Sequence, residues 1–205
     1  MTAGEAEKVV PAVSDGGQPW ALFASAAFDG NSDRIKLHGG ADSRLEALSG
    51  SYENRFTLHF DFRFDGFQGS ETAHVLWKSG AFQLTVVSGG NVEASVGGHT
   101  ALVWSGLQRG RWYRAIWSAS KDDQGHFLWM RRMDPLTGWY ADPGTGGSGA
   151  CVYQAWTSNL PSPGDVWIGH DGSSDASLYF HGRLDNVALV NFVPTARPSG
   201  CTLQQ

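Results

Sequence analysis

Apolar and polar residues alternate along several short stretches of the chain, most regularly in RFTLHFDFRF at residues 55–64. One side of an extended chain would carry Phe56, Leu58, Phe60, Phe62 and Phe64, and the other side Thr57, His59, Asp61 and Arg63. A period of two predicts a β-strand with one face in the core and the other in solvent. No helix can sort these residues in that way.

Further stretches of the same kind follow at short intervals: AHVLWK, AFQLTVV, VEASV, ALVWS, RWYRAIWSAS, HFLWMRRM, DVWIG and SLYFHGRLDNVALVN. Gly-containing turn signals such as Asp65-Gly66 and Asp171-Gly172 separate them. No long stretch shows the 3.6-residue period of a helix. We therefore predict an all-β protein of ten or more strands with little helix. A long excursion is expected over residues 131–163, which are rich in Gly, Pro and Ser.

The size and composition favour one folded domain. A chain of 205 residues with 27 glycines and 17% charged residues suits a large all-β sandwich that does not divide. Residues 1–18 contain Pro, Gly and scattered charge, so we interpret them as a tail or linker that leads into a first strand at Trp20. The domain is expected over residues 19–194, and a C-terminal tail over residues 195–205.

The net charge of −5 and the absence of a basic run argue against a nucleic-acid partner. No apolar run reaches the roughly 18 residues of a membrane span. The first residues also lack the basic start and apolar middle of a secretory signal. We expect either a signal removed before the present numbering or export by another route, for example within a particle.

The two cysteines, Cys151 and Cys201, are too few for a disulfide framework and are wrongly spaced for a zinc site. A bridge between them would attach the C-terminal tail to a Gly-rich loop. Two reduced thiols are the alternative, and the sequence leaves both open.

Four segments, in this order, are similar to the laminin-G-like family of the concanavalin A-like lectin and glucanase sandwiches: AAFDGNSDRIKL, RFTLHFDFRF, LQRGRWYRAIWSAS and VWIGHDG with YFHGRLDNVALVN. They span residues 20–192. The resemblance implies a jelly-roll sandwich of two antiparallel sheets, each with six or seven strands.

The same resemblance implies a structural calcium ion between the turn after the first strand and the acid of the closing Gly-Arg-Leu-Asp motif. The ligands would come from Asp29, Gly30, Asn31 and Asp185, with Asp33 at the next alternate position. Calcium takes six to eight oxygens from carboxylates and main-chain carbonyls, which such a turn can present. The alternative is an ordinary hairpin turn in which the carboxylates accept neighbouring backbone N–H groups. The acidic turn at residues 170–175 is a second, weaker candidate.

Catalytic motifs are incomplete in this sequence. Retaining glycan hydrolysis needs two carboxylates about 5 Å apart, and in this fold family they typically form a Glu-x-Asp-x-x-Glu strand, which is absent. The lyase pattern Gln-x-His is absent as well. The stretch GGSGA at residues 146–150 lacks the last Gly of a serine nucleophile elbow, so we interpret it as a loop.

Aromatic rings remain as candidates for recognition, because sugars stack on rings while polar groups fix their hydroxyls. The candidate ligand-binding residues are Trp139, Tyr140, Asp142, Tyr153, Trp156, His170 and Asp171. The alternative is that these rings close one end of the sandwich. Most of the tryptophans inside strand patterns are assigned to packing, namely Trp77, Trp112, Trp117, Trp129 and Trp167.

We therefore predict a non-catalytic, lectin-like binding domain at a cell or virion surface or in the extracellular space, joined to a larger assembly through its N-terminal tail. A glycan is the expected partner. A glycan-cleaving enzyme of the same fold and a structural module that contacts protein through a sheet face are the alternatives, and the second would make a homo-oligomer plausible.

Overall fold

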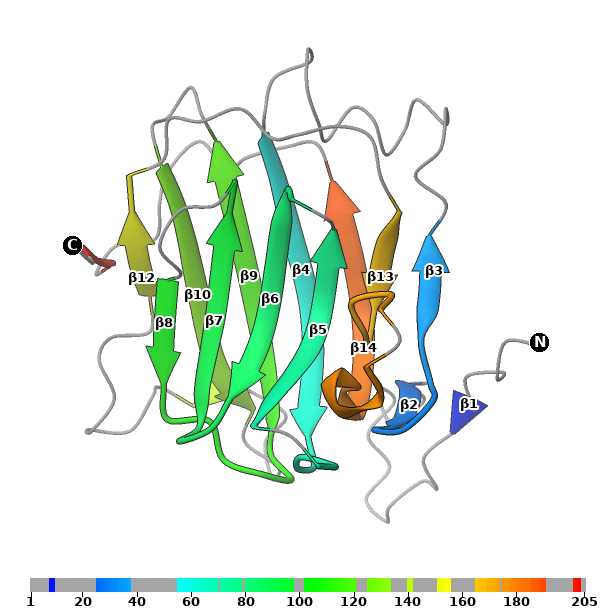
Figure 1. Ribbon diagram of the computed structural model, residues 1–205. Helices are drawn as coiled ribbons and strands as arrows, with labels where there is room; N and C mark the ends of the chain where they lie inside the picture. The colour runs from blue at the N-terminus through cyan, green and yellow to red at the C-terminus, as the bar shows by residue number, and fades with distance from the viewer. Residues whose placement is uncertain are drawn as a thin grey trace.

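The computed structural model consists of two stacked β-sheets (Figure 1). It describes residues 8–9, 25–37, 55–69, 71–78, 80–97, 102–120, 125–133, 140–141, 151–155, 165–173, 175–190 and 201–203. The predicted all-β jelly-roll sandwich is confirmed. The one helical segment among these residues is a single 3-10 turn, Ala176–Leu178.

The larger sheet has nine strands, in the order β1-β2-β14-β4-β9-β10-β12-β15 with β11 beside β10. Their bounds are β1 Lys8–Val9, β2 Ser25–Asp29, β14 His181–Val190, β4 Arg55–Phe64, β9 Trp112–Ser120, β10 Gly125–Met133, β11 Tyr140–Ala141, β12 Cys151–Gln154 and β15 Thr202–Leu203. Neighbouring strands are antiparallel except for the edge pair β12 and β15, which is parallel.

The smaller sheet has six strands, in the order β3-β13-β5-β6-β7-β8, and all of its pairs are antiparallel. Their bounds are β3 Ile35–Leu37, β13 Val166–Ile168, β5 Thr72–Lys78, β6 Phe82–Val87, β7 Asn91–Val96 and β8 Leu102–Ser105. The prediction of six or seven strands in each sheet is therefore wrong for the larger sheet, which gains its extra strands at its edges.

The core lies between the sheets and is built by the predicted alternation. Phe56 of β4 is fully buried and lies edge-on to Trp117 of β9, with ring centroids 5.0 Å apart. Edge-to-face packing suits aromatic rings because it brings the positive edge of one to the negative face of the other. The outer face of β4 departs from the prediction, since Thr57 and Asp61 are buried there rather than solvated.

Two short strands near the two ends of the described chain belong to the larger sheet. Lys8 and Val9, within the expected tail 1–18, pair with β2, and Thr202 and Leu203, within the expected tail 195–205, pair with β12. These two strands lie at opposite edges of the sheet, with β1 at one edge in Figure 1.

A disulfide joins Cys151 to Cys201, with Cα atoms 4.4 Å apart. Cys151 lies in strand β12 and not in the Gly-rich loop that the sequence suggests. The long excursion over residues 131–163 thus contains β11 and β12. The bridge closes 50 residues of chain and fastens β15 to the edge of the sheet.

No helical segment in the described part of the chain has the length and apolar character that a membrane crossing requires.

Candidate functional site

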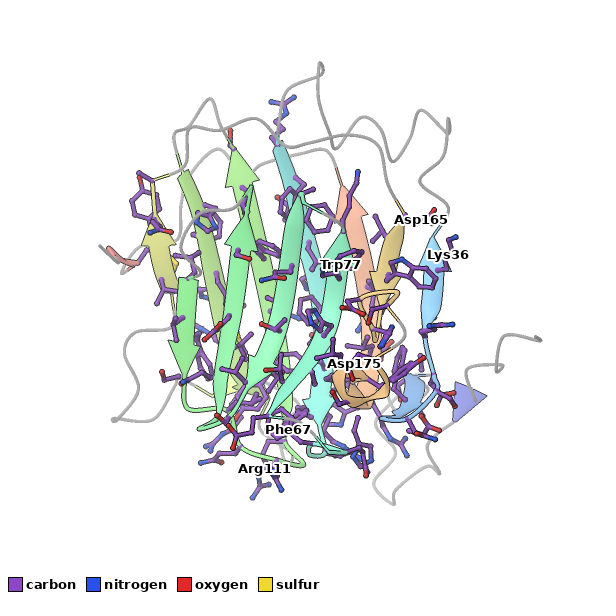
Figure 2. All side chains as sticks on the ribbon, viewed as in Figure 1. Lys36, Phe67, Trp77, Arg111, Asp165 and Asp175 are labelled. Carbon is purple, nitrogen blue, oxygen red and sulfur yellow. A yellow bond between two sulfur atoms is a disulfide. The ribbon has the colours of Figure 1, made fainter. Side chains whose placement is uncertain are left out.

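A cavity of about 390 Å³ lies on the outer face of the smaller sheet. Its walls are formed by Trp77, Asp165, Trp167, Asp171, Gly172 and Ser173. Figure 2 labels Trp77 on β5 and, towards the edge strand β3, Asp165 and Lys36. The cavity therefore combines two large aromatic rings with a small number of polar groups, as ligand-binding sites in proteins commonly do.

The register of three strands places the two rings side by side. Trp167 of β13 lies directly opposite Trp77 of β5, and its other neighbour is Lys36 of β3. Val166 and Ile168 point into the core, so Trp167 between them must point outward. Both tryptophans are half-buried. Cross-strand neighbours have Cβ atoms about 5 Å apart, so the two side chains leave the sheet at adjacent positions, and we call this pair the tryptophan platform.

Two cations fix the position of Trp167. The Arg34 guanidinium carbon lies 5.3 Å from the Trp167 ring centroid, and the Lys36 Nζ lies 5.2 Å from it. Lys36 also forms an ion pair with Asp165, Nζ to Oδ2 2.7 Å. In the part of the chain that the structure describes, Trp77 has no ring or cation partner of this kind. Trp77 is therefore the ring available for stacking, and Trp167 is the ring held in place.

The turn that closes the cavity contains a buried histidine with a fixed tautomer. His170 Nδ1 accepts the backbone N–H of Gly172 at 3.0 Å, and His170 Nε2 lies 2.9 Å from the carbonyl oxygen of Asp175, to which it must donate. These two contacts place the ring proton on Nε2. Asp171 Oδ1 approaches Nδ1 at 3.5 Å, but that nitrogen carries no proton, so this contact is not an ion pair.

Asp171 presents an ionised carboxylate at the cavity wall. Burial by itself would raise the pKa of Asp171, but hydrogen bonds from the Ser173 hydroxyl and backbone N–H outweigh it, and the pKa is lowered. The Ser173 N–H donates at 2.8 Å. Gly172 has φ +78°, and a side chain there would collide with the Trp167 ring, so a glycine is required for the turn to close against the platform.

His74 of β5 packs beneath this turn. Tyr179 bridges to the His74 backbone and stacks on His170, with ring centroids 3.9 Å apart and planes at 22°. His74 is buried, and its Nδ1 has no hydrogen-bond partner among the residues that the structure describes. Burial lowers the pKa of His74, and the negative charge of Asp171 offsets this only in part. The rings of His170 and Tyr179 therefore form one stacked pair that braces this turn.

The structure brings part of the predicted ligand-binding set to this site. Asp171 lines the cavity, whereas His170 is fully buried with both ring nitrogens engaged. Tyr153 lies in β12 of the larger sheet, opposite Phe127, far along the fold from the β13 turn (Figure 1). Tyr140 belongs to the short strand β11. Trp139, Asp142 and Trp156 lie outside the described residues.

The assignment of strand tryptophans to packing is correct for Trp117, which is fully buried, and wrong for the platform. Trp77, Trp112, Trp129 and Trp167 are all half-buried on outer sheet faces. The alternation in DVWIG could have identified Trp167. Val166 and Ile168 on either side of it belong to the core face, so Trp167 belongs to the outer face of the strand.

The expected calcium ligands are not brought together. His181 pairs with Asp29 and Leu184 with Ala26, so Asp185 lies four positions, or about 13 Å, along the strand from Asp29. The Asp29 carboxylate instead accepts the N–H groups of Asn31 at 2.7 Å and Ser32 at 2.8 Å. Gly30 has φ +77° and provides the left-handed residue that this turn needs. The residues present do not fit a calcium site that includes Asp185.

Asp185 instead faces Asp61 across the strand pair of β14 and β4. Asp61 is buried and is held by Arg114 through two hydrogen bonds of 2.8 and 2.9 Å and by the Asn186 amide at 2.8 Å. Asn186 adopts φ +52° in a bulge of β14, which turns its amide towards Asp61. Burial raises the pKa of Asp185, and the Asp61 charge raises it further. Since both Asp61 oxygens are bound, this pair of acids is a structural centre.

No protein-family model matches the sequence, and no curated protein matches it.

Solved structures with the same fold do exist. A Bacteroides ovatus protein assigned to carbohydrate binding is 16% identical with a TM-score of 0.57 over 83% of this chain and 44% of its own. The carbohydrate-binding module CBM40 of a Ruminococcus gnavus sialidase, bound to α2,3-sialyllactose, is 10% identical with a TM-score of 0.53 over 83% of this chain and 88% of its own. A heptameric pentraxin of Limulus polyphemus is 12% identical with a TM-score of 0.51 over 80% and 73%.

These likenesses show the fold, a lectin-like jelly-roll sandwich, and do not single out a laminin-G-like relationship. The chain spans less than half the length of the Bacteroides ovatus protein.

Proposed function

We propose that this chain is a glycan-binding domain whose ligand stacks on the tryptophan platform. The observation that carries the proposal is the pair of outward-facing, directly opposed rings of Trp77 and Trp167 in a cavity of about 390 Å³. Sugars bury their C–H faces on aromatic rings, and a rigid strand pair offers such a surface at little cost in conformational entropy.

Polar groups around the platform suit the hydroxyls of a sugar. Asp165 and Asp171 supply acceptors, and Lys36 and Ser173 supply donors. Each is fixed by a contact within the protein: Lys36 by its ion pair with Asp165, and Asp171 by hydrogen bonds from Ser173. The site is therefore preorganised.

The similar structures support the ligand class. One is assigned to carbohydrate binding, and another is a carbohydrate-binding module bound to a sialylated sugar. The disulfide between Cys151 and Cys201 favours an oxidising compartment, and we propose that the domain acts at a cell or particle surface as the adhesive part of a larger assembly.

A glycan-cleaving activity is the second candidate, because two carboxylates, Asp165 and Asp171, line the cavity. Hydrolysis with a carboxylic acid as proton donor needs one pKa to be raised. The pKa of Asp171 is lowered, and Asp165 is engaged by Lys36, so neither group is set up as a general acid. We therefore favour binding without cleavage.

A glycan array followed by titration of the best ligand tests the proposal. Trp77→Ala should weaken binding at least about tenfold, because the ring removed supplies the stacking surface. The matched control is Trp129→Ala, which removes a half-buried ring that lies against Arg131 on the other sheet. Equal losses in both variants, or none in Trp77→Ala, would reject the platform.

The same ligands should be incubated with the protein and assayed for new reducing ends or unsaturated sugars. Release that disappears in Asp171→Asn would establish the second candidate and displace the first.

A further inference from the structure

One end of the sandwich gathers arginines that the platform does not use. Arg109 and Arg111 belong to the connection between β8 and β9, and Arg132 lies near the end of β10, opposite Tyr113. Figure 2 shows Arg111 and Phe67 together at the lower end of the molecule, well away from Trp77. We call Arg109, Arg111 and Arg132 the arginine end.

The connection that carries two of these arginines is tethered to both sheets. Gly106 and Leu107 donate to the carbonyl of Gly90 in the smaller sheet at 3.1 and 2.9 Å. Gly110 donates to the carbonyl of Phe64 in the larger sheet at 2.8 Å. The backbone of the arginine end is therefore held by the core and not by its own side chains.

Arg109 is also held at its charged tip. Its guanidinium carbon lies 5.9 Å from the ring centroid of Phe67, and Phe67 packs edge-on against the buried Phe64 at 4.8 Å. A cation over an aromatic face keeps its N–H donors free at the edge, where they can reach an anion.

The other two arginines lie close to the buried Tyr113, since Arg132 is its cross-strand neighbour and Arg111 precedes it by two residues. Burial raises the pKa of Tyr113 and the two positive charges lower it in part, and its hydroxyl accepts the N–H of Gln108 at 2.9 Å. Arg132 donates to the side chain of Gln108 at 3.3 Å. Positive charge therefore accumulates around the short segment from residue 108 to residue 111.

Within the described ranges this charge has no internal counterpart, because none of the three arginines forms an ion pair with a carboxylate there. The acid nearest in sequence to Phe64 and Phe67 is Asp65, and Arg63 already binds it through two hydrogen bonds of 2.8 and 2.6 Å. A chain with a net charge of −5 thus keeps three guanidinia unneutralised at one place.

We propose that the arginine end binds the oxyanion groups, carboxylates or sulfate esters, of an acidic polysaccharide. The planar guanidinium fork matches both groups in two-point hydrogen bonds. The patch is local, and the negative charge of the remaining surface opposes an extended polyanion such as nucleic acid. A polysaccharide with spaced acidic groups fits these conditions and is compatible with a second contact at the platform.

Three dextrans of equal chain length separate the chemistry: unmodified, carboxymethylated and sulfated. We expect the intact protein to bind one or both charged polymers more tightly than dextran, and to lose this preference in 0.5 M salt because exposed ion pairs are screened. The polymer that is preferred identifies the oxyanion. No preference for either charged polymer would overturn the proposal.

Arg109→Gln and Arg111→Gln should each weaken binding to the charged dextran about fivefold. Arg55→Gln is the control, because it makes the same charge change about 30 Å away, at the other end of β4. A similar loss in the control would mean that net charge alone is responsible and would reject the site.

Trp77→Ala should leave the preference for the charged polymer intact, which makes this test independent of the platform. A last experiment measures binding of the protein to vesicles of anionic and of neutral phospholipid. Binding to the anionic vesicles without binding to charged dextran would replace the polysaccharide with a membrane surface and overturn the inference.

Discussion

The two outer sheet faces use the same strand pattern to different ends. On the smaller sheet, Trp77 and Trp167 point outward into a cavity with room for a ligand. On the larger sheet, Asp61 also points away from the core but is buried, with both of its oxygens bound by Arg114 and Asn186. The outer face of the smaller sheet is therefore open at these side chains, and the outer face of the larger sheet is closed around Asp61.

The difference shows that an outward position does not by itself make a functional residue. Alternation decides which side of the sheet a residue takes, and cross-strand partners decide whether it stays available. Arg114 lies directly opposite Asp61 and satisfies it, whereas Trp77 lies opposite Gln83 on one side and Trp167 on the other. The open face can therefore be altered at little cost in stability, and the closed face cannot.

The largest expected effect on stability comes from the disulfide at the edge of the larger sheet. Replacing Cys151 and Cys201 by Ser should reduce the free energy of unfolding by about 4 kcal/mol, because the bridge closes 50 residues of chain in the unfolded state. Urea denaturation measures this. The platform should keep its ligand affinity in the folded fraction, and a matching loss of affinity would show that the two faces are coupled.

Arg114→Ala should cost about 3 kcal/mol, because it leaves the buried Asp61 carboxylate without its main partner. Arg63→Ala is the control. Both partners of its ion pair with Asp65 remain partly accessible to solvent, 29% and 24%, whereas Asp61 is only 4% exposed, so the control should cost about 1 kcal/mol or less. Urea denaturation measures both losses. Equal losses of unfolding free energy in the two variants would show that the buried contacts of Asp61 stabilise the larger sheet no more than the Arg63–Asp65 pair does.

The free energy of unfolding should depend on pH through His74, which lies in β5 near the platform. The pKa of His74 in the folded state lies below its value of 6.5 in the unfolded chain, mainly because of burial. The unfolded state therefore binds more protons as the pH falls below 6.5, and stability present above that pH is lost. His74→Gln should flatten the dependence measured by urea denaturation between pH 7.5 and 5. His59, whose pKa is also lowered, contributes to the slope that remains.

The smallest effect is expected at the turn that connects β2 of the larger sheet to β3 of the smaller. Asp29 uses its carboxylate to accept backbone N–H groups of its own turn. Thermal melting with and without a calcium chelator should give the same midpoint. A drop in the midpoint would restore the calcium hypothesis with a ligand set that excludes Asp185.

The strands could be predicted because burial on one face leaves a period of two in the sequence. RFTLHFDFRF is β4 from its first residue to its last, and most of the other predicted strands appear within a residue or two of the expected bounds. The edge strands β1 and β15 could not be found in this way. Each has only two residues, and what holds them, a neighbouring strand or a disulfide, is distant in the sequence.

The candidate site was only partly predictable for a related reason. Asp171 was found because it belongs to a local turn motif. Trp77 and Trp167 are 90 residues apart, and only the register between β5 and β13 shows that their rings are neighbours. The predicted position of Asp185 beside Asp29 is wrong because it came from the resemblance alone. Its actual neighbour, Asp61, follows from the register between β14 and β4, which the sequence does not reveal.

The attachment of both β1 and β15 to the edges of the larger sheet has a practical consequence. A molecule tethered to a sensor chip or a bead through either terminus is anchored by the sheet that carries no platform. The tether then does not pass over the tryptophan platform, so immobilised protein should keep its affinity for soluble polymers.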